Sequence, residues 1–428
     1  MRIGIIGGGE SGVGAALLAL KVGDEPYVSD YGLINPVYRQ NLIENSVRFE
    51  EGGHNFDILV TSDLIVKSPG VKDNTPIVLS LKAQGLTVIS ELEYGARHCN
   101  GKIIAITGSN GKTTTTNLTH HMLVTAGLDA VKGGNLGTCL CSLLLERDHD
   151  VYVLEVSSFQ LDGIVGFRPN ISILINITPD HLDRYDYNFD LYADSKMRIS
   201  MNQMPDDCFI YGSDNDVINS RLSLVEAIKI PVSVKDLGID GISDRNPFLR
   251  GRHNKINAGC AIEAVRLLDV SDDHILKAIA TFKNDDHRLQ TVAKINDVEW
   301  INDSKATNVD AVFYALDAIN NPIIWMVGGV DKGNDYRELL ELVRSKVKVM
   351  ICIGVDNQKL IETFGSMPLE INQTQSMDEA MKIAEDHVVG GDVVLLSPAC
   401  ASFDLFKNYK DRGNQFVSGV WKLLRKRR

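Results

Sequence analysis

With 428 residues, the chain is too long for one ordinary hydrophobic core, so two to four domains are expected. Its 44% hydrophobic and 23% charged residues are typical of soluble globular proteins, and the net charge of −12 argues against non-specific nucleic-acid binding. Seven scattered cysteines, without metal or disulfide spacing, indicate a reducing compartment, and we expect a cytoplasmic protein.

Two further features bear on partners. No apolar run reaches membrane-spanning length, and residues 1–7 are too short and glycine-rich for a signal sequence. The one dense basic run, 422–428, is interpreted as a solvated helix end. We therefore expect no membrane and no nucleic acid among the partners.

The first segment, residues 1 to about 95, alternates strands and helices. Its predicted strands are 1–6, 27–30, 57–60, 64–66 and 87–89, and a helix is predicted at 15–20. A G-x-G-x-x-G turn follows the first strand at 7–12, and Asp30 ends the second strand, where a dinucleotide fold carries its ribose-binding carboxylate. Taken alone, this pattern suggests an NAD-binding domain. A lone glycine motif is weak evidence, however, and indicates only that phosphates can approach the turn.

The central segment, about 96 to 290, opens on a phosphate-binding pattern. An apolar strand at 103–106 is followed by a Gly/Ser/Asn turn and by a helix that opens with Lys112 and Thr113. Gly108 and Gly111 let backbone N–H groups approach oxyanions, Lys112 can reach the β- and γ-phosphates, and the Thr113 hydroxyl can bind Mg²⁺. The loop has the shorter T-G-x-x-G-K-T form rather than the full G-x-x-x-x-G-K-[ST] pattern.

Later strands of the central segment also end in polar residues. Glu155 ends the strand at 150–155, after a polar turn predicted at 133–137, and His181 follows the strand at 171–177. A carboxylate at a strand end can bind a second Mg²⁺ or orient water, although a solvated glutamate is the alternative. Together with the phosphate loop, these residues predict a cleft along the carboxyl edge of one parallel sheet.

Two helices complete the central segment. Lys196 lies on a predicted helix at 192–198, and base rates alone favour a surface lysine there. Asn254 and Asn257 share one face where a helix at 258–267 begins. A domain boundary is expected near residue 290.

The last segment, about 291 to 428, is predicted to be a third α/β unit. Its expected strands are 298–301, 323–327, 349–353 and 393–396, and its expected helices are 309–316, 337–343, 358–364 and 377–387. Three polar loops follow strand ends, at 302–308, 328–333 and 397–403. If they share one sheet edge, they form a second wall facing the central cleft.

At these residues the chain resembles the Mur ligases, ATP-dependent enzymes that add amino acids to the cell-wall precursor. The shared pattern comprises T-G-S-N-G-K-T at 107–113, Glu155, His181, Lys196, H-N-x-x-N at 253–257 and His287-Arg288. Within the family, three motifs resemble the branch that adds D-glutamate: E-V-S-S-F-Q-L at 155–161, N-D-S-K-A-T-N at 302–308 and S-P-A-C-A-S-F-D-L-F-K-N-Y at 397–409.

The resemblance implies an α/β fold with three domains. These are an N-terminal Rossmann-like domain at 1–95 that holds the UDP of the substrate, a central P-loop-type mononucleotide-binding domain at 96–290, and a C-terminal Rossmann-like domain at 291–428 that holds the amino acid. It also implies the activity: D-glutamate is joined to UDP-N-acetylmuramoyl-L-alanine through an acyl phosphate and a tetrahedral intermediate, in peptidoglycan precursor synthesis. The implied cofactors are ATP and two Mg²⁺ ions, and we expect a monomer.

The resemblance also implies roles for individual residues. Those matching the UDP-substrate site are Glu10, Ser11, Asp30, Ser68, Gly70 and Asn135. Those matching the ATP site are Gly108, Asn110, Gly111, Lys112, Thr113, Thr114, Asn254, Asn257, Arg288 and Asp303. Those matching the D-glutamate site are Thr307, Lys332, Ser402 and Tyr409, with Lys332 pairing with a substrate carboxylate. The implied metal ligands are Thr113, Glu155, His181 and carbamylated Lys196, and the implied catalytic residues are Lys112, Glu155, His181 and Lys196.

One departure from the family pattern concerns the residues that bind the uracil base of the substrate. Asp30 is followed by Tyr31-Gly32, where many relatives carry Ser/Thr-Arg, so the sequence leaves open which groups bind uracil. Other functions also stay open. A P-loop kinase or nucleotide-hydrolysing switch shares the phosphate loop but has no need of the loops at 302–308 and 397–409, and a non-catalytic nucleotide-binding module would make Glu155, His181 and Lys196 coincidental. Among ligases, a different amino acid or a folate-like acceptor is the alternative.

Overall fold

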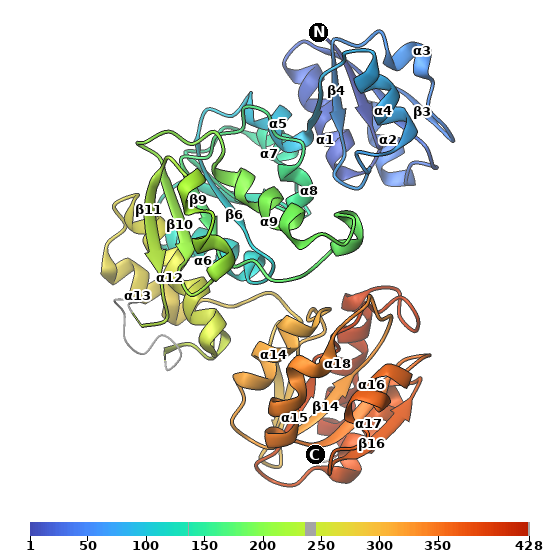
Figure 1. Ribbon diagram of the computed structural model, residues 1–428, viewed down its shortest axis with the longest axis vertical. Helices are drawn as coiled ribbons and strands as arrows, with labels where there is room; N and C mark the ends of the chain where they lie inside the picture. Colours follow the sequence, from blue (N-terminus) through green and yellow to red (C-terminus); the bar gives the residue numbers. More distant parts are fainter. Residues whose placement is uncertain (136, 236–244, 427–428) are drawn as a thin grey trace. The chain divides into compact units, whose positions relative to one another are not determined.

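The structure, a computed structural model, describes residues 1–135, 137–235 and 245–426. Leu136 of the predicted polar turn, and Arg427 and Arg428 of the basic run, lie outside the described residues. The chain divides into two compact units, 1–238 with 256–279 and 239–255 with 280–428. The first unit contains two sheets and the second contains one (Figure 1). In the part of the chain that is described, no helix combines the length and apolarity needed to cross a membrane.

The N-terminal sheet is parallel, with the strand order β3-β2-β1-β4-β5. Its strands are β1 Arg2–Ile6, β2 Glu25–Asp30, β3 Arg48–Glu51, β4 Leu64–Lys67 and β5 Val88–Ser90. Its helices are α1 Glu10–Lys21, α2 Pro36–Glu44, α3 Phe56–Leu59, α4 Pro76–Ala83 and α5 Glu91–Ala96. The order of the strands reverses at β1 and β4, and ligands of open α/β sheets bind at the carboxyl ends of such strands.

The central sheet is also parallel, with the order β11-β10-β9-β6-β8-β7. Its strands are β6 Lys102–Thr107, β7 Ala130–Gly134, β8 Val151–Glu155, β9 Ile171–Leu174, β10 Cys208–Gly212 and β11 Ile228–Val232. Its helices are α6 Lys112–Thr125, α7 Leu140–Glu146, α8 Ser158–Leu161, α9 Phe189–Met197, α10 Asp216–Asn219, α12 Arg252–Arg266 and α13 Asp272–Thr281. Because β6 lies between β8 and β9, the polar residues that follow these three strands meet at one edge.

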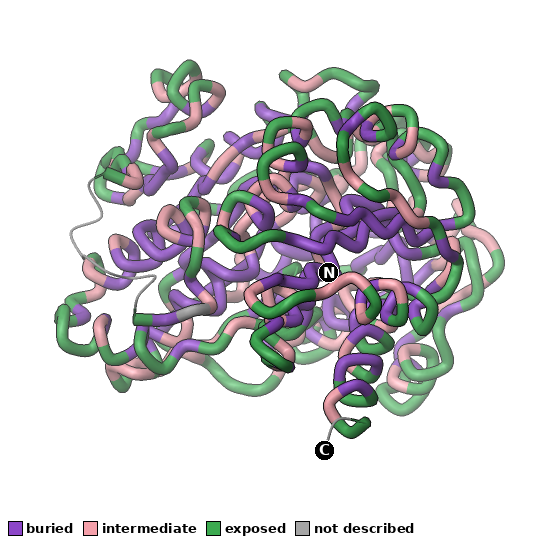
Figure 2. Tube along the Cα trace, turned by 90° about the horizontal axis from the view of Figure 1, so that it is seen from below, coloured by how far each residue is buried: buried purple, intermediate pink, exposed green. Residues whose placement is uncertain are grey.

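The two sheets of the first unit share a hydrophobic core. Helix α7 packs against α1 and α5, and one cluster of buried apolar residues includes strands of both sheets. Figure 2 shows the buried residues of the chain in purple. A buried carboxylate reinforces the junction: Glu93 of α5 accepts hydrogen bonds from the backbone N–H groups of Val165, Gly166 and Phe167 at 3.0, 3.0 and 2.7 Å. Backbone donors that lack a helix or sheet partner are thereby satisfied.

The C-terminal sheet has the order β12-β13-β17-β14-β15-β16, with only β12 antiparallel to its neighbour. Its strands are β12 Gln290–Ile295, β13 Val298–Asn302, β14 Ile323–Val327, β15 Val347–Ile353, β16 Glu370–Thr374 and β17 Val393–Leu396. Its helices are α14 Val309–Asp317, α15 Leu340–Lys346, α16 Gln358–Phe364, α17 Met377–His387 and α18 Tyr409–Lys426, and the 3-10 helix η5 covers Tyr336–Leu339. Two separate buried clusters cover the two faces of this sheet.

The sequence-based prediction is wrong for one strand and for part of one turn. The strand predicted at 57–60 is wrong, because residues 57–59 belong to the single helical turn α3 and Val60 is its C-cap. The Asn55 side chain caps the other end of α3 by accepting a hydrogen bond from the Ile58 N–H. The turn predicted at 133–137 is wrong in its first two residues, because Gly133 and Gly134 end strand β7. A Cβ at Gly134 would overlap the Glu155 carbonyl oxygen of the neighbouring strand, so glycine permits this close pairing.

Candidate active site

A tight phosphate-binding loop joins β6 to α6. Gly111 occupies the N-cap of α6 with a φ of 86°, a left-handed conformation that glycine adopts without strain. A Cβ at Gly111 would overlap the side-chain amide of Asn257, so Asn257 of α12 lies directly against the loop. Lys112 and Thr113 follow at the helix N-terminus, where backbone N–H groups and the helix dipole favour anions.

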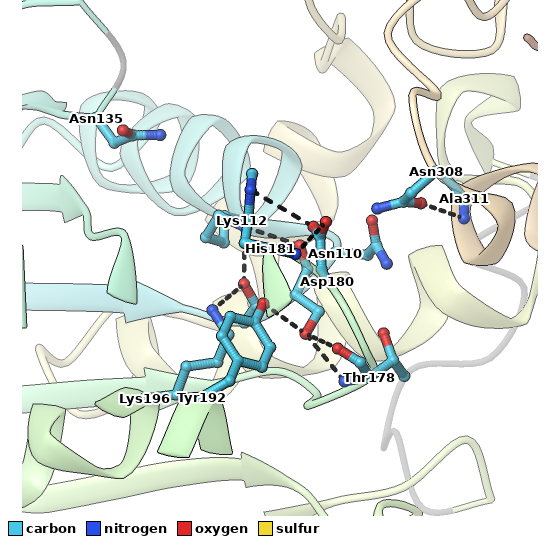
Figure 3. Close-up of polar contacts among 12 residues, drawn as sticks. Asn110, Lys112, Asn135, Thr178, Asp180, His181, Tyr192, Lys196, Asn308 and Ala311 are labelled. Atoms are coloured by element: carbon cyan, nitrogen blue, oxygen red, sulfur yellow. Dashed lines mark hydrogen bonds and ion pairs between the residues drawn. The ribbon is translucent and has the colours of Figure 1, made fainter. Parts of the chain in front are cut away.

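Side-chain hydrogen bonds fix the shape of this loop (Figure 3). The Ser109 hydroxyl donates to the Thr178 carbonyl oxygen at 2.8 Å and accepts from the Thr178 N–H at 2.9 Å. The Asn110 N–H donates to Oδ1 of Asn176 at 2.9 Å, and Nδ2 of Asn176 donates to the Asn110 carbonyl oxygen at 3.2 Å. The segment that follows β9 therefore holds two residues of the loop in place.

Two lysines meet on one carbonyl of the loop. Nζ of Lys112 donates to the carbonyl oxygens of Gly108 and Ser109 at 2.7 and 2.8 Å, and Nζ of Lys196 donates to the same Gly108 oxygen at 2.9 Å. Lys196 also lies over the ring of Tyr192, 4.7 Å from its centroid. Base rates favoured a surface position for Lys196, but it is only 2% exposed. Burial, and secondarily the neighbouring Lys112 charge, hold the pKa of the Lys196 amine well below its usual range.

Thr113 and Glu155 form a pair of oxygen donors at the N-terminus of α6. The Thr113 hydroxyl donates to Oε2 of Glu155 at 2.7 Å, and Nδ2 of Asn135 donates to Oε1 of the same carboxylate at 2.8 Å. Both Thr113 and Glu155 are buried. A hydroxyl and a carboxylate beside a phosphate-binding loop are the donors that Mg²⁺ prefers, so these residues fit that ion.

His181 follows β9 at the same edge of the central sheet. It has a left-handed φ of 53°, its side chain is 46% exposed, and its Nε2 lies 3.7 Å from Oδ2 of Asp180. Its ring forms a T-shaped pair with the Phe159 ring, with the centroids 5.3 Å apart. Within the described ranges, no three His, Cys, Asp or Glu side chains form a ready-made metal cluster. The structure thus places His181 after β9, at the edge of the sheet where Glu155 ends β8.

Both predicted asparagines lie in the first turns of α12 and are buried. Asn257 packs on the phosphate loop, as described above, whereas Nδ2 of Asn254 donates to the Arg250 carbonyl oxygen at 2.9 Å. Thr114, the remaining loop-proximal candidate, is buried in the first turn of α6. The helix spacing therefore brings Asn257 to the loop, while Asn254 stabilises the start of α12.

The N-terminal sheet gathers several of the residues predicted to bind UDP. Oδ2 of Asp30 accepts a hydrogen bond from the Gly8 N–H at 2.6 Å, and Oδ1 accepts one from the Gly32 N–H at 2.8 Å. The Ser68 hydroxyl donates to the Gly7 carbonyl oxygen at 3.2 Å. The glycine turn, Asp30 and Ser68 therefore lie together at the carboxyl edge of β1, β2 and β4.

Two other residues predicted to bind UDP have contacts elsewhere. Asn135 lies against Glu155 of the central sheet, and Glu10 reaches α7: its Oε1 accepts hydrogen bonds from the Cys139 N–H at 2.8 Å and from the Ser142 hydroxyl at 3.2 Å. Ser11 is half-buried in α1, and Gly70 is exposed in the turn after β4. The Glu10 carboxylate thus joins the N-terminal sheet to the first turn of α7.

In the second unit, Asp303 is a buried acid at the end of β13. Oδ2 of Asp303 accepts a hydrogen bond from the Ser397 hydroxyl at 2.8 Å, and Oδ1 accepts one from the Leu289 N–H at 3.1 Å. Burial raises the pKa of Asp303 to about 7, and these hydrogen bonds and the Arg288 charge only partly offset the effect. Arg288 itself is half-buried, two residues before β12 begins.

Three of the residues predicted to bind D-glutamate lie on loops that follow strands of this sheet, and the fourth, Tyr409, begins α18. Lys332 is exposed, Thr307 and Tyr409 are half-buried, and Ser402 is buried. An isolated bridge pairs Val330 with Ala401, which brings the loops of Lys332 and Ser402 side by side. The Ser304 hydroxyl donates to the Tyr409 carbonyl oxygen at 2.8 Å, and Nζ of Lys305 lies 4.0 Å from the centroid of the Tyr409 ring.

Arg412, a residue outside the predicted site, connects these loops. This buried side chain of α18 donates to the Ser304 hydroxyl and carbonyl oxygen at 3.0 Å, and to the carbonyl oxygens of Cys400 and Gly328 at 3.2 and 3.4 Å. Burial lowers the pKa of Arg412 to about 10. A signal was present: Arg412 shares one face of α18 with Phe416, four residues later, where a charge is otherwise unexpected.

Three family models match the chain. The Mur ligase MurD-like N-terminal domain matches residues 1–90, the Mur ligase middle domain matches 106–245, and the Mur ligase glutamate ligase domain matches 287–400. Among solved structures, MurF ligase from Thermotoga maritima in complex with ADP is similar, with a TM-score of 0.63, 14% identity, and coverage of 94% of this chain and 96% of that one. This similarity concerns the fold.

Relatives of known name match almost the whole chain. A UDP-N-acetylmuramoylalanine–D-glutamate ligase from Cytophaga hutchinsonii is 45% identical, with 99% of both chains covered. Another of the same name from Christiangramia forsetii is 44% identical, with 98% of this chain and 99% of the relative covered. The chain therefore belongs to the Mur ligase family, in its MurD-like branch.

Proposed function

We propose that this chain joins D-glutamate to UDP-N-acetylmuramoyl-L-alanine at the expense of ATP, in peptidoglycan precursor synthesis. The observation that carries the proposal is the match, at 44–45% identity and 98% coverage or more, to ligases named for this reaction. The fixed phosphate loop with Lys112, Thr113 and Glu155 supports ATP as the energy source.

The reaction has two steps. A carboxylate is a poor acyl donor, so the carboxylate of the muramoyl-alanine first takes the γ-phosphoryl group of ATP, which gives an acyl phosphate and ADP. The amine of D-glutamate then attacks the acyl carbon, and the tetrahedral intermediate loses phosphate and a proton to leave the amide. Both steps gather anions, so cationic side chains and metal ions are needed to offset the repulsion.

In this proposal the central loop binds and orients the triphosphate. The N–H groups at the start of α6 and the Lys112 ammonium contact phosphate oxygens, with Lys112 exchanging its carbonyl contacts for the ligand. The Asn257 side chain packs against Gly111 and so helps to keep the loop in this conformation. Because Ser109 and Asn110 are already fixed, little ordering is required when the nucleotide binds.

Mg²⁺ would neutralise phosphate charge at the site. Thr113 would hold one ion together with ATP phosphates, and Glu155 and His181 would hold a second. Carbamylation of Lys196 by CO₂ would supply a further anionic ligand. This modification requires a neutral amine, and the lowered pKa of Lys196 favours that form.

In this proposal the second unit supplies further residues for ATP and the site for D-glutamate. Arg288 and Asp303 are proposed to contact ATP, and the exposed Lys332 is proposed to pair with a carboxylate of D-glutamate. Thr307, Ser402 and Tyr409 complete the proposed amino-acid site. The buried Arg412 would act as a positioning residue, because it holds the loops on which Ser304 and Cys400 lie.

The proposal is tested by measuring ADP release with UDP-N-acetylmuramoyl-L-alanine as acceptor and with D-glutamate, L-glutamate, L-alanine or diaminopimelate as the amine. We expect ADP only with D-glutamate. ADP release that needs no amino acid would favour a kinase or a nucleotide-hydrolysing switch, and a preference for another amino acid would assign the chain to a different ligase specificity.

A further inference from the structure

A cluster of three polar side chains lies where β2 and β3 end, at the carboxyl edge of the N-terminal sheet. The Ser29 hydroxyl donates to Oε1 of Glu50 at 2.6 Å, and Nδ1 of His54 lies 2.7 Å from the same hydroxyl oxygen. Glu50 also accepts a hydrogen bond from the Asn55 N–H at 2.6 Å. These bonds fix the His54 ring at the start of the segment that leads into α3.

The hydrogen bonds determine the tautomer of His54. The Ser29 hydroxyl has one hydrogen, and the Glu50 carboxylate can only accept, so that hydrogen points to Glu50. The Ser29 oxygen must then accept from His54, which puts the ring proton on Nδ1. Nε2 of a neutral His54 is left as an acceptor, and among the described residues it has no hydrogen-bond partner.

The ring is mainly neutral near pH 7. Burial lowers the pKa of His54, and the nearby carboxylates of Glu50 and Asp30 only partly oppose this effect. A half-buried histidine with a fixed tautomer therefore presents one acceptor atom in a constant direction.

Beside His54 lies a large exposed aromatic ring. Tyr31 is 79% exposed, and its ring centroid is 6.0 Å from that of His54, with an angle of 44° between the planes. Leu33 and Val37, on the same loop and the following helix, are 84% and 68% exposed. An exposed aromatic ring next to a directed acceptor is suited to a flat, polar ring such as a nucleobase.

The position of the cluster relative to the glycine turn indicates which part of a nucleotide it meets. The Gly8 N–H contacts Asp30 at the end of β2, and Tyr31 is the next residue. In sheets of this order the diphosphate lies at the glycine turn and the ribose at the acid ending β2, so the base extends towards the loops after β2 and β3. Those loops carry Tyr31 and His54.

We propose that His54 selects uracil in the UDP-bearing substrate: its Nε2 accepts a hydrogen bond from the uracil N3–H, while the base lies against Tyr31. Ser29 and Glu50 are positioning residues that set the tautomer. Cytosine has an acceptor at N3, so the same contact disfavours it. The inference rests on the proposed function and identifies His54 as the residue that distinguishes uracil from other bases.

The test uses the whole protein and compares the binding of UDP and CDP by titration calorimetry. The two probes have the same ribose and diphosphate, so their difference isolates the base. His54→Phe keeps a ring beside Tyr31 and removes the acceptor. We expect it to weaken UDP binding about tenfold, the effect of one hydrogen bond, and to leave CDP binding nearly unchanged.

Ser29→Ala is a second variant, because it leaves His54 in place but frees its tautomer. We expect the preference for UDP over CDP to fall by several-fold, less than in His54→Phe. The matched control is His274→Phe, since Nδ1 of His274 is likewise bonded to a serine hydroxyl, Ser271 at 3.0 Å, but on the exposed start of α13. It should bind both nucleotides as the wild type does.

The inference is overturned if His54→Phe and Ser29→Ala both bind UDP with an unchanged preference over CDP. A purely structural role of the cluster predicts equal weakening for both nucleotides and would overturn it too. If the folded wild type binds no UDP, the proposed function fails together with this inference. If the variants keep their preference while D-glutamate-dependent ADP release persists, only this inference fails.

Discussion

The buried acid Asp303 allows a quantitative prediction about stability. The substitution Asp303→Asn removes an ionisable group and keeps the shape of the side chain. The amide oxygen can still accept from the Leu289 N–H, and the amide N–H₂ can donate to the Ser397 oxygen, so the two hydrogen bonds at this site survive. The main change is that the side chain at position 303 no longer binds or releases a proton as the pH changes.

The magnitude follows from the pKa of Asp303, about 7 in the folded chain against an ordinary value of 3.8. Between these two values the folded state binds more protons than the unfolded state, so the free energy of unfolding falls as the pH rises. From pH 5 to pH 7 the wild type should lose about 2 kcal/mol through this group, because the slope of about 1.4 kcal/mol per pH unit flattens as the pH approaches the folded pKa. The variant should lose none of it.

The three tryptophans restrict the measurement to the unfolding of the second unit. Trp300, Trp325 and Trp421 all belong to the second unit, on β13, β14 and α18, so urea-induced changes in tryptophan fluorescence report the unfolding of that unit. We expect Asp303→Asn and wild type to differ by less than about 1 kcal/mol at pH 5, and the variant to be more stable by about 3 kcal/mol at pH 8. Asp386→Asn, on the exposed side of α17, is the matched control.

Parallel stability profiles for wild type and Asp303→Asn between pH 5 and pH 8 would refute this reasoning. They would mean that Asp303 is ionised in the folded chain at pH 5, and that burial does not dominate its pKa. A profile that also flattens in Asp386→Asn would assign the pH dependence to general charge effects instead.

Three further predictions concern the central loop and the loops of the second unit. Glu155→Gln should reduce D-glutamate-dependent ADP release by at least about 100-fold, because an amide replaces the carboxylate proposed to bind Mg²⁺, while folding is retained. Arg412→Met should destabilise the second unit by about 3 kcal/mol in the tryptophan assay, because buried carbonyl groups lose their donor. Lys196→Met should abolish activity without loss of thermal stability, and ¹³CO₂ should give a carbamate signal in the wild type only.

Each of these predictions has a control and an opposing outcome. Glu146→Gln, exposed at the end of α7, should keep full activity, and equal loss in both glutamate variants would argue against a specific role of Glu155. An Arg412→Met protein as stable as wild type would show that the loops of the second unit do not need the Arg412 hydrogen bonds for their stability. An unmodified Lys196 in a fully active, metal-bound enzyme would contradict the carbamate.

Local pattern was sufficient to predict the phosphate loop. A strand, a glycine turn and a Lys-Thr pair are adjacent in sequence, and they specify the geometry seen at Gly111 and Lys112. The position of Glu155 at the end of a strand is also predictable from the sequence, because an apolar run ends there. Such features depend on neighbouring residues, so the sequence carries them directly.

Contacts between distant residues could not be predicted in the same way. The partner of Glu10 is Cys139, 129 positions away, and Arg412 bonds Ser304 across 108 positions. The strand β3 was missed because its residues, Arg48–Glu51, are mostly polar on a sheet edge. The sequence predicts a strand at 57–60 because three successive apolar residues do not distinguish a strand from one helical turn.

The central claim is that ATP cleavage by this chain is coupled to amide formation with D-glutamate. The most direct measurement follows radiolabelled D-glutamate into a UDP-bearing product and compares it with ADP released in the same reaction. We expect one labelled product per ADP in the wild type and neither in Lys112→Ala, which removes the ammonium group of the phosphate loop. ADP formed without label transfer, or label transfer at the wild-type rate in a folded Lys112→Ala protein, would contradict the account.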